Sequence, residues 1–125
     1  MKTRLLLAAA IGLASAAPAW AHHSAAMFDS TKQVTLEGTV KDFQFTNPHS
    51  WIQLNVADAS GKVTEWSLET GGTSSLYKRG VRASSLKPGD KITVVANPLK
   101  NGNPGGNVRT VTGADGKRII GGGEG

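Results

Sequence analysis

The sequence predicts an all-β domain with one short helix, arranged as an OB-like five-stranded Greek-key barrel. Apolar residues alternate with polar residues over several short segments, which is typical of half-buried strands. These segments follow the order strand, strand, strand, short helix, strand, strand, and the first strand is long and curved. This is the order of elements in the OB fold. A β-sandwich is the alternative, although five strands are few for one.

The first strand is expected to begin near Gln33 and to contain a bulge. The even-numbered positions from Val34 to Val40 are apolar or glycine, whereas the next large side chains, Phe43 and Phe45, occupy odd positions. A slip of one residue inside a long strand is what a β-bulge produces. We therefore predict a bulge near Lys41-Asp42, which would curve the strand strongly.

Two further strands are expected to complete an antiparallel meander. After a turn at Asn47-Pro48, alternating apolar residues predict a second strand over 52–56. Residues 58–62 have the composition of a turn, and residues 63–69 alternate again as a third strand. The short loops between these strands favour pairing between neighbours in sequence.

A helix and a tight turn are expected to follow the meander. Thr73 is suited to cap a short helix, and Gly80 is suited to end it in a left-handed conformation. The segment Leu86 to Asp90 contains Pro-Gly and predicts a tight turn, because proline fixes φ and glycine tolerates positive φ.

The last two strands are predicted over residues 92–96 and 108–112. The residues between them, 97–107, are rich in Gly, Asn and Pro and are expected to form a loop. A short apolar segment at Ile119-Ile120 ends the predicted domain. Residues 121–125 are almost all glycine and are expected to form a disordered tail.

The N-terminus has the features of an export signal. Lys2 and Arg4 precede an apolar run from Leu5 to Ala16, and Ala19-Trp20-Ala21 matches the small-x-small pattern of a cleavage site. The run is too short to span a bilayer as a permanent helix, so an uncleaved anchor is the less favoured alternative.

Cleavage after Ala21 would divide the chain into three parts. Residues 1–21 would be the signal peptide, and residues 22–120 would form one β-barrel domain that begins with an N-terminal arm, 22–32. The mature protein would be periplasmic or secreted, without an integral membrane segment. Its oligomeric state does not follow from the sequence.

The composition limits the classes of partner and chemistry. Removal of Lys2 and Arg4 leaves 12 basic residues against 9 acidic ones, which lowers the net charge from +5 to +3. A mildly basic surface without a run of like charges does not indicate a nucleic-acid partner. The chain has no cysteine, which excludes disulfides and thiolate metal ligands.

The three histidines suggest a metal site. Cleavage after Ala21 would give His22 a free α-amino group, which can chelate a metal together with its imidazole. His23 or His49 could complete a nitrogen-rich set of the kind that Cu(II) favours, so copper is the expected metal. This arrangement requires the arm to fold back along the first strand. The alternative is an exposed N-terminus whose histidines contact nothing.

The segment Thr46 to Trp51 suggests a second kind of binding. In an OB barrel the loop between the first two strands flanks the ligand face. Asn47, Trp51, Phe43 and Phe45 could form a stacking surface for a saccharide, an envelope component or a protein partner. The alternative is that these aromatic residues fill the end of the barrel and that Asn47-Pro48 is only a turn.

No catalytic constellation stands out, and we expect a binding protein rather than an enzyme. No serine lies in a Gly-x-Ser-x-Gly elbow. Glu65 and Glu69 would share one face of a strand, but their neighbours do not mark them as an acid and a base. Lys78, Arg79 and Arg82 form a basic cluster, which either meets an anionic partner or is a solvated helix end.

Several motifs together resemble a family of small exported bacterial proteins catalogued as a domain of unknown function. They occur in the expected order, and Gly71-Gly72-Thr73 departs from the pattern because a less glycine-rich entry to the helix is expected. The resemblance implies export and the barrel but no activity. The matching segments are Ala21 to Ser24, Phe28-Asp29, Leu36 to Val40, Thr46 to His49 with Trp51, and Leu86 to Asp90.

Overall fold

A computed structural model describes residues 25–122 of the chain. The predicted signal peptide, the predicted cleavage site, His22 and His23 lie outside the described residues, so the expectations about them stay predictions. The strands are β1 (Val34–Gln44), β2 (Ser50–Ala57), β3 (Val63–Thr70), β4 (Lys91–Pro98), β5 (Gly105–Gly113) and β6 (Arg118–Ile120). The helices are α1 (Thr73–Lys78) and two single 3₁₀ turns, Ala25–Met27 and Ala83–Ser85.

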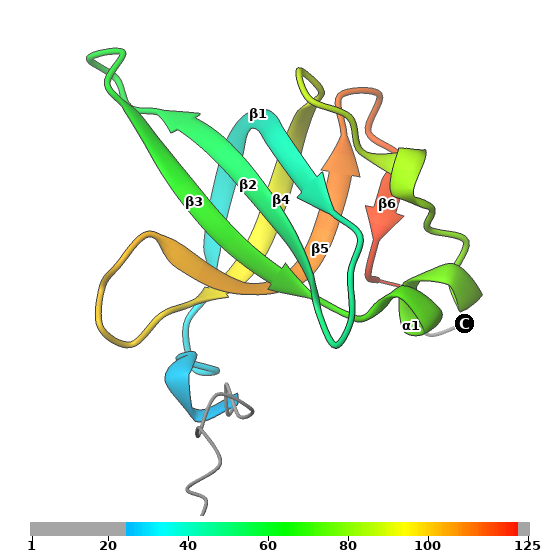
Figure 1. The fold of residues 1–125 in the computed structure, drawn as a ribbon. Helices are drawn as coiled ribbons and strands as arrows, with labels where there is room; N and C mark the ends of the chain where they lie inside the picture. Colours follow the sequence, from blue (N-terminus) through cyan, green and yellow to red (C-terminus); the bar gives the residue numbers. More distant parts are fainter. Residues whose placement is uncertain (1–24, 123–125) are drawn as a thin grey trace, which may run out of the picture.

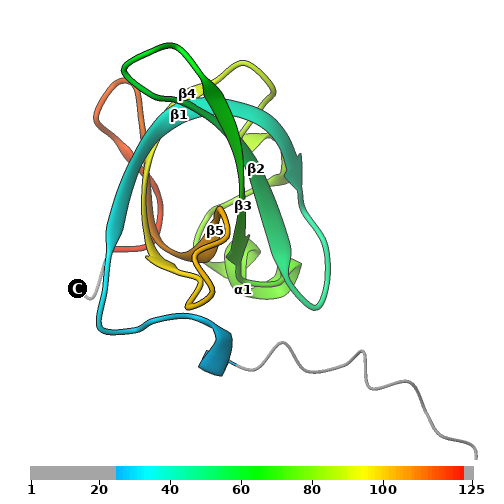
Figure 2. The ribbon, with the colours of Figure 1, turned by 90° about the vertical axis from the view of Figure 1, so that its left-hand side faces the viewer.

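The prediction of an OB-like barrel is confirmed. The strands follow the order β3-β2-β1-β4-β5 in one sheet, and a parallel pairing of β3 with β5 closes this sheet into a five-stranded barrel. Figure 1 shows β5 crossing the end of β3, and Figure 2 looks into the barrel with α1 at its lower end. The short strand β6, which contains the apolar Ile119-Ile120, pairs only with β5.

The predicted bulge in the first strand is present. Val40 pairs with Leu54 and Asp42 with Gln53, so Lys41 is the extra residue. The predicted turn at Leu86 to Asp90 supports this point of β1, because the backbones of Val40 and Asp90 are hydrogen-bonded at 2.8 Å. The bulge lets one long strand pair with β2 over its second half and with β4 over its first half.

The start of α1 differs from the prediction, whereas its end agrees. Thr73 does not cap the helix. Gly72 occupies the N-cap without a side-chain hydrogen bond, and Asn47 from the β1–β2 loop accepts hydrogen bonds of 3.0 Å from both the backbone N–H and the hydroxyl of Thr73. Gly80 has φ +86° and ends the helix as expected, with Val81 donating to the carbonyl of Leu76.

The prediction of a loop over 97–107 is wrong at both ends. β4 continues to Pro98 and β5 begins at Gly105, which pairs with Ser67 of β3. A Cβ atom on Gly105 would lie 2.7 Å from a Leu99 methyl and 3.1 Å from the Ser67 carbonyl. This glycine therefore marks a close approach of strands where the barrel closes, and not a turn.

The core fills the barrel and its α1 end with aliphatic side chains. Ile52, Leu54, Leu68 and Val94 are fully buried at its centre. Leu76 of α1 belongs to the same cluster, so the helix covers one end of the barrel. The remaining members of the buried cluster are Leu36, Val40, Val81, Leu86, Ile92, Ala96, Val111 and Ile120.

Candidate functional site

The most distinctive polar contact of the structure joins His49 and Glu69. His49 precedes β2 by one residue, and the hairpin register pairs Trp51 with Glu69. His49 and Glu69 are therefore diagonal neighbours on the outer face of the hairpin. The His49 Nδ1 atom lies 2.7 Å from Glu69 Oε1, with the histidine side chain 43% exposed and the glutamate side chain 5% exposed.

This contact fixes the role of each ring nitrogen. A carboxylate accepts hydrogen bonds, so His49 donates through Nδ1. Its Nε2 atom is left for a ligand, and the imidazole makes no other side-chain hydrogen bond in the described part of the chain. A histidine held through one nitrogen by a carboxylate is the usual arrangement of an oriented metal ligand and of a general base.

The second oxygen of the same carboxylate has no partner. Glu69 Oε2 is buried and accepts no hydrogen bond from any described residue. Leaving a buried acceptor unsatisfied costs about 1–3 kcal/mol, and more when the group is charged. Buried groups of this kind usually have a partner in an ion or a water molecule. Glu69 is thus the clearest sign of a site for a bound group.

Glu69 is buried because β5 and the N-terminal arm cover it. Asn107 of β5 pairs with Glu69 in the parallel register that closes the barrel. Ala25, Phe28 and Ser30 from the arm line a cavity of about 280 Å³ together with His49 and Glu69. The cavity therefore lies between the first described residues of the arm and the histidine of the β1–β2 loop.

Three backbone contacts and one side-chain contact hold the arm in this place. Phe28 forms a β-bridge with Leu99, and the Asp29 N–H donates to the Pro98 carbonyl at 2.8 Å. The Lys100 N–H donates to the Met27 carbonyl at 3.0 Å. The buried Asn97 side chain donates to the Lys32 carbonyl at 2.7 Å. The arm is thus part of the folded domain from Ala25 onward.

The loop that carries His49 is held by its own side chains. The Thr46 hydroxyl donates to the His49 carbonyl at 2.7 Å, and the buried Ser50 hydroxyl is hydrogen-bonded to the Thr46 backbone at 3.2 Å. The Asn47-Pro48 peptide bond is cis. Asn47, predicted as a ligand-binding residue, here caps α1. Its side chain therefore links the histidine loop to the helix.

The glycine-rich entry to α1 has a physical reason in this loop. A Cβ atom on Gly72 would lie 2.6 Å from the Pro48 carbonyl oxygen and 2.9 Å from the Asn47 side-chain oxygen. Only glycine lets the two backbones approach this closely without displacement. Gly72, in the segment Gly71-Gly72-Thr73 that departs from the family pattern, therefore allows the histidine loop to lie against the start of α1.

The aromatic residues predicted at the second kind of site lie in two places. Phe43 and Phe45 are half-buried, pack against the core and contact each other with ring centroids 5.9 Å apart. Trp51 is half-buried on the outer face, opposite Glu69. Trp51 is therefore the aromatic residue of this set that lies on the same face as the His49–Glu69 pair.

Arginine and asparagine complete the surroundings of the pair. Asn107, Arg79 and Arg109 line a second cavity of about 320 Å³ that also touches His49 and Glu69. Arg82, from the predicted basic cluster, instead lies with its guanidinium 3.6 Å above the Tyr77 ring and donates to the carbonyls of Tyr77 and Val81. Arg79 and Arg82 of the predicted cluster thus lie in two different environments.

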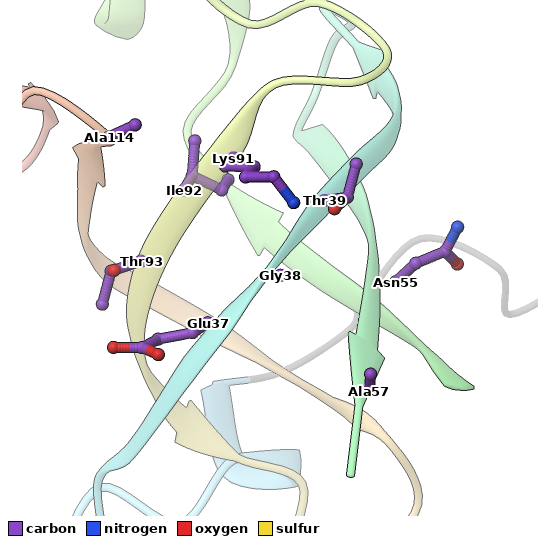
Figure 3. A pocket seen from close by; sticks show the side chains of 9 residues that line it. All are labelled: Glu37, Gly38, Thr39, Asn55, Ala57, Lys91, Ile92, Thr93 and Ala114. Atoms are coloured by element: carbon purple, nitrogen blue, oxygen red, sulfur yellow. The ribbon is translucent and has the colours of Figure 1, made fainter. Parts of the chain in front are cut away.

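Another depression, of about 390 Å³, lies at the curved middle of β1 around Gly38. In Figure 3, Glu37 and Asn55 point in opposite directions. These two side chains therefore do not converge on a ligand in this depression.

Glu69 is the residue that sequence reasoning missed. The sequence pattern places it on one strand face with Glu65 and does not mark the two as a paired acid and base. In the structure Glu65 is exposed and contacts Lys41 at 2.8 Å, whereas Glu69 is buried. The hairpin register that follows from the turn at 58–62 would have placed His49 and Glu69 on one face. The burial of Glu69 depends on β5 and the arm, which are distant in sequence.

The described residues alone do not make a complete metal site. Among residues 25–122, no group of three or more histidine, aspartate, glutamate or cysteine side chains could hold a metal ion. Additional ligands would have to come from outside residues 25–122. Within the same described range, no helix has the length and apolar character of a membrane span.

Comparison with known proteins agrees with the resemblance seen in the motifs. A family model described as a family of unknown function, DUF6152, matches residues 10–109. The chain belongs to the DUF6152 family. The matched range includes the histidine loop, Glu69 and most of β5, so all residues of the His49–Glu69 pair and its cover lie within the family's domain. Comparisons with curated proteins and with solved structures find no match.

Proposed function

We propose that this DUF6152 member is an exported metal-binding module that holds a copper ion between its N-terminus and the His49–Glu69 pair. The observation that carries the proposal is the buried, unpartnered Oε2 of Glu69, beside a histidine whose Nε2 remains for a ligand. His49 would be a metal ligand, and Glu69 would orient its ring and neutralise charge.

The remaining ligands are assigned to the mature N-terminus. Ala25 lines the same cavity as His49 and Glu69. Three residues of extended chain span roughly 10 Å, so His22 and His23 are within reach of the cavity from Ala25. Cleavage after Ala21 would supply the α-amino group and imidazole of His22. Two or three nitrogen donors favour Cu(II) over Zn(II) in the general order of affinities.

Binding is favoured over catalysis by the surroundings of the histidine. His49 and Glu69 also have the geometry of a general base and its orienting carboxylate. However, no serine or threonine hydroxyl among residues 25–122 is hydrogen-bonded to the His49 imidazole. A nucleophile for covalent catalysis is therefore missing from the described part of this site.

Isothermal titration of the mature protein with Cu(II) and with Zn(II) tests the proposal. Copper should bind more tightly than zinc, and binding should weaken between about pH 8 and pH 5 because a protonated imidazole cannot ligate. His49→Ala and removal of His22 and His23 should each weaken copper binding. Glu69→Gln should weaken it by roughly 10- to 100-fold, as loss of a carboxylate behind a ligating histidine does.

Glu65→Gln is the matched control, because it removes a carboxylate from the same strand at an exposed position away from the cavity. It should bind copper like the wild type. If copper binds the protein without His22 and His23 as well as it binds the wild type, the metal proposal fails. The aromatic surface around Trp51 would then be the remaining candidate for binding a saccharide, an envelope component or a protein.

A further inference from the structure

Three arginines from three different elements surround one hollow beside α1, which we call the arginine cavity. Arg79 follows α1, Arg109 lies on β5 and Arg118 on β6, and the cavity between them has a volume of about 800 Å³. Among the residues that the structure describes, no aspartate or glutamate lines it. Among residues 25–122 these arginines form no ion pair. Three positive side chains therefore border this hollow, while the acidic Glu69 lines the neighbouring cavity together with Arg79 and Arg109.

The local backbone leaves room for these side chains. Ala96 pairs with Val108 and Val95 with Thr110, so Arg109 is the extra residue of a bulge in β5. Bulges change the direction of a side chain and are frequent next to active sites. Past β6, a Cβ atom on Gly121 would collide with the Arg109 carbonyl, and one on Gly122 would collide with the Arg118 guanidinium. Side chains at these two positions would therefore disturb the arginines and fill the hollow.

Apolar side chains line part of the arginine cavity. Leu76, Val81 and Ile120 are buried, and Val108 and Ile119 are half-buried. Guanidinium groups bind carboxylate and phosphate oxygens through paired hydrogen bonds, and several of them around one point favour a dianion. A ligand for this surface thus needs a doubly charged oxyanion next to an apolar group.

We propose that the arginine cavity binds a phosphate monoester group that is attached to a short apolar body. The ligand could be a soluble organic phosphate or the headgroup of an anionic lipid, which share this chemistry. The proposal goes beyond copper binding. Arg79 and Arg109 border the His49–Glu69 pair as well, whereas Arg118 lines only the arginine cavity. Arg118→Gln therefore separates the two proposals.

Titration of the full mature chain with hexyl phosphate and with inorganic phosphate is the first test. Hexyl phosphate should bind more tightly than inorganic phosphate because the apolar walls contact its chain. Arg118→Gln should weaken binding of hexyl phosphate by about 10- to 100-fold, the range expected for loss of one hydrogen bond to a charged group. Binding should also weaken at about 1 M salt, where screening is strong. The matched control is Lys62→Gln, which removes one positive charge in the exposed β2–β3 turn.

The source of the ligand is tested with vesicles of phosphatidylcholine, with and without phosphatidic acid. Sedimentation with the phosphatidic acid vesicles that depends on Arg118 supports a lipid headgroup. Binding of hexyl phosphate without sedimentation supports a soluble phosphate. Equal loss of hexyl phosphate binding in Arg118→Gln and Lys62→Gln, or no preference over hexanol, overturns the proposal. Copper affinity should be unchanged in Arg118→Gln, so failure of either proposal is distinguishable from failure of the other.

Discussion

At the scale of single residues, the candidate site depends on one carboxylate that the fold buries without satisfying. Glu69 has one oxygen paired with His49 and the other without a partner among the described residues. Natural proteins often retain such a costly group where it serves binding, and the cost is removed when a ligand or a substitution neutralises it. The stability of the metal-free protein should therefore report on this residue directly.

Glu69→Gln should raise the free energy of unfolding of the metal-free protein by about 1 kcal/mol, because it removes a charge from a buried position while keeping the size of the side chain. Denaturant unfolding at neutral pH measures this change. Glu65→Gln, which changes an exposed side chain, should leave the unfolding free energy within about 0.5 kcal/mol of the wild type. A loss of stability in Glu69→Gln would mean that the carboxylate is already compensated.

Neighbouring glycines offer a second prediction at this scale. Gly72→Ala should lower the free energy of unfolding by about 1–3 kcal/mol, because its methyl group would press on the Pro48 carbonyl at 2.6 Å. Gly71→Ala is the control, since its methyl group would meet the side chains of Ser75 and Leu76 at ordinary distances of 3.4 Å and 3.8 Å. Thermal unfolding compares the two. Equal stabilities would show that the histidine loop can move away at no cost.

At the scale of elements, sequence patterns predict what local alternation and turn chemistry determine. The change of phase between Val40 and Phe43 predicts the bulge at Lys41. Pro88-Gly89 predicts the tight turn, whose backbone is hydrogen-bonded to Val40 beside the bulge. The cap of α1 and the start of β5 follow instead from contacts with distant segments. Asn47 replaces a local cap, and Gly105 lies where two strands meet, so neither could be read from neighbouring residues.

In the candidate site, too, one residue is predictable from local sequence and another depends on distant contacts. His49 is recognisable from the sequence because histidines are rare in this chain and one follows a proline turn. The burial of Glu69 results from the parallel pairing with β5 and from the docked arm, and both are long-range features. The arginine cavity likewise joins residues from α1, β5 and β6 that no local pattern groups together.

The N-terminal arm gives a prediction about pH at the scale of elements. The hydroxyl and then the backbone N–H of Thr31 bind the Asp29 carboxylate and hold its pKa below the ordinary value of 3.8. A carboxyl with a lowered pKa stabilises the fold above its unfolded value, and this contribution is lost as the pH falls through the lowered pKa. Docking of the arm should therefore be constant above about pH 4 and weaken in stronger acid.

Amide hydrogen exchange at Asp29 and Lys100, whose N–H groups are bonded across the arm contact, measures this docking. Asp29→Asn should speed exchange at both amides at neutral pH, because the charged acceptor for Thr31 is lost. Asp58→Asn is matched to it, since a hydrogen bond from Ser60 lowers the pKa of Asp58 in the same way but in the β2–β3 turn. Faster exchange in both variants would argue against a specific role of Asp29 in the arm.

At the scale of the whole molecule, the barrel brings three separate parts of the chain to one region. The β1–β2 loop supplies His49, and the end of β3 supplies Glu69. The arm, held by β4 and the loop that follows it, lines a cavity with both residues. The closing pair β3–β5 places Arg109 next to them. The proposed copper site therefore depends on the closed barrel for two groups and on processing of the precursor for the others.

Processing of the precursor gives the last prediction. Mass spectrometry of the exported protein should show a chain that begins at His22, because Ala19-Trp20-Ala21 matches the cleavage pattern. Only this start gives His22 an α-amino group that can bind copper together with its imidazole. One alanine added before His22 should therefore weaken copper binding while leaving the thermal stability of the metal-free protein unchanged. A mature chain that keeps Met1, or that begins after His23, would remove the amine from the site and leave His49 and Glu69 without the nitrogen ligands that copper requires.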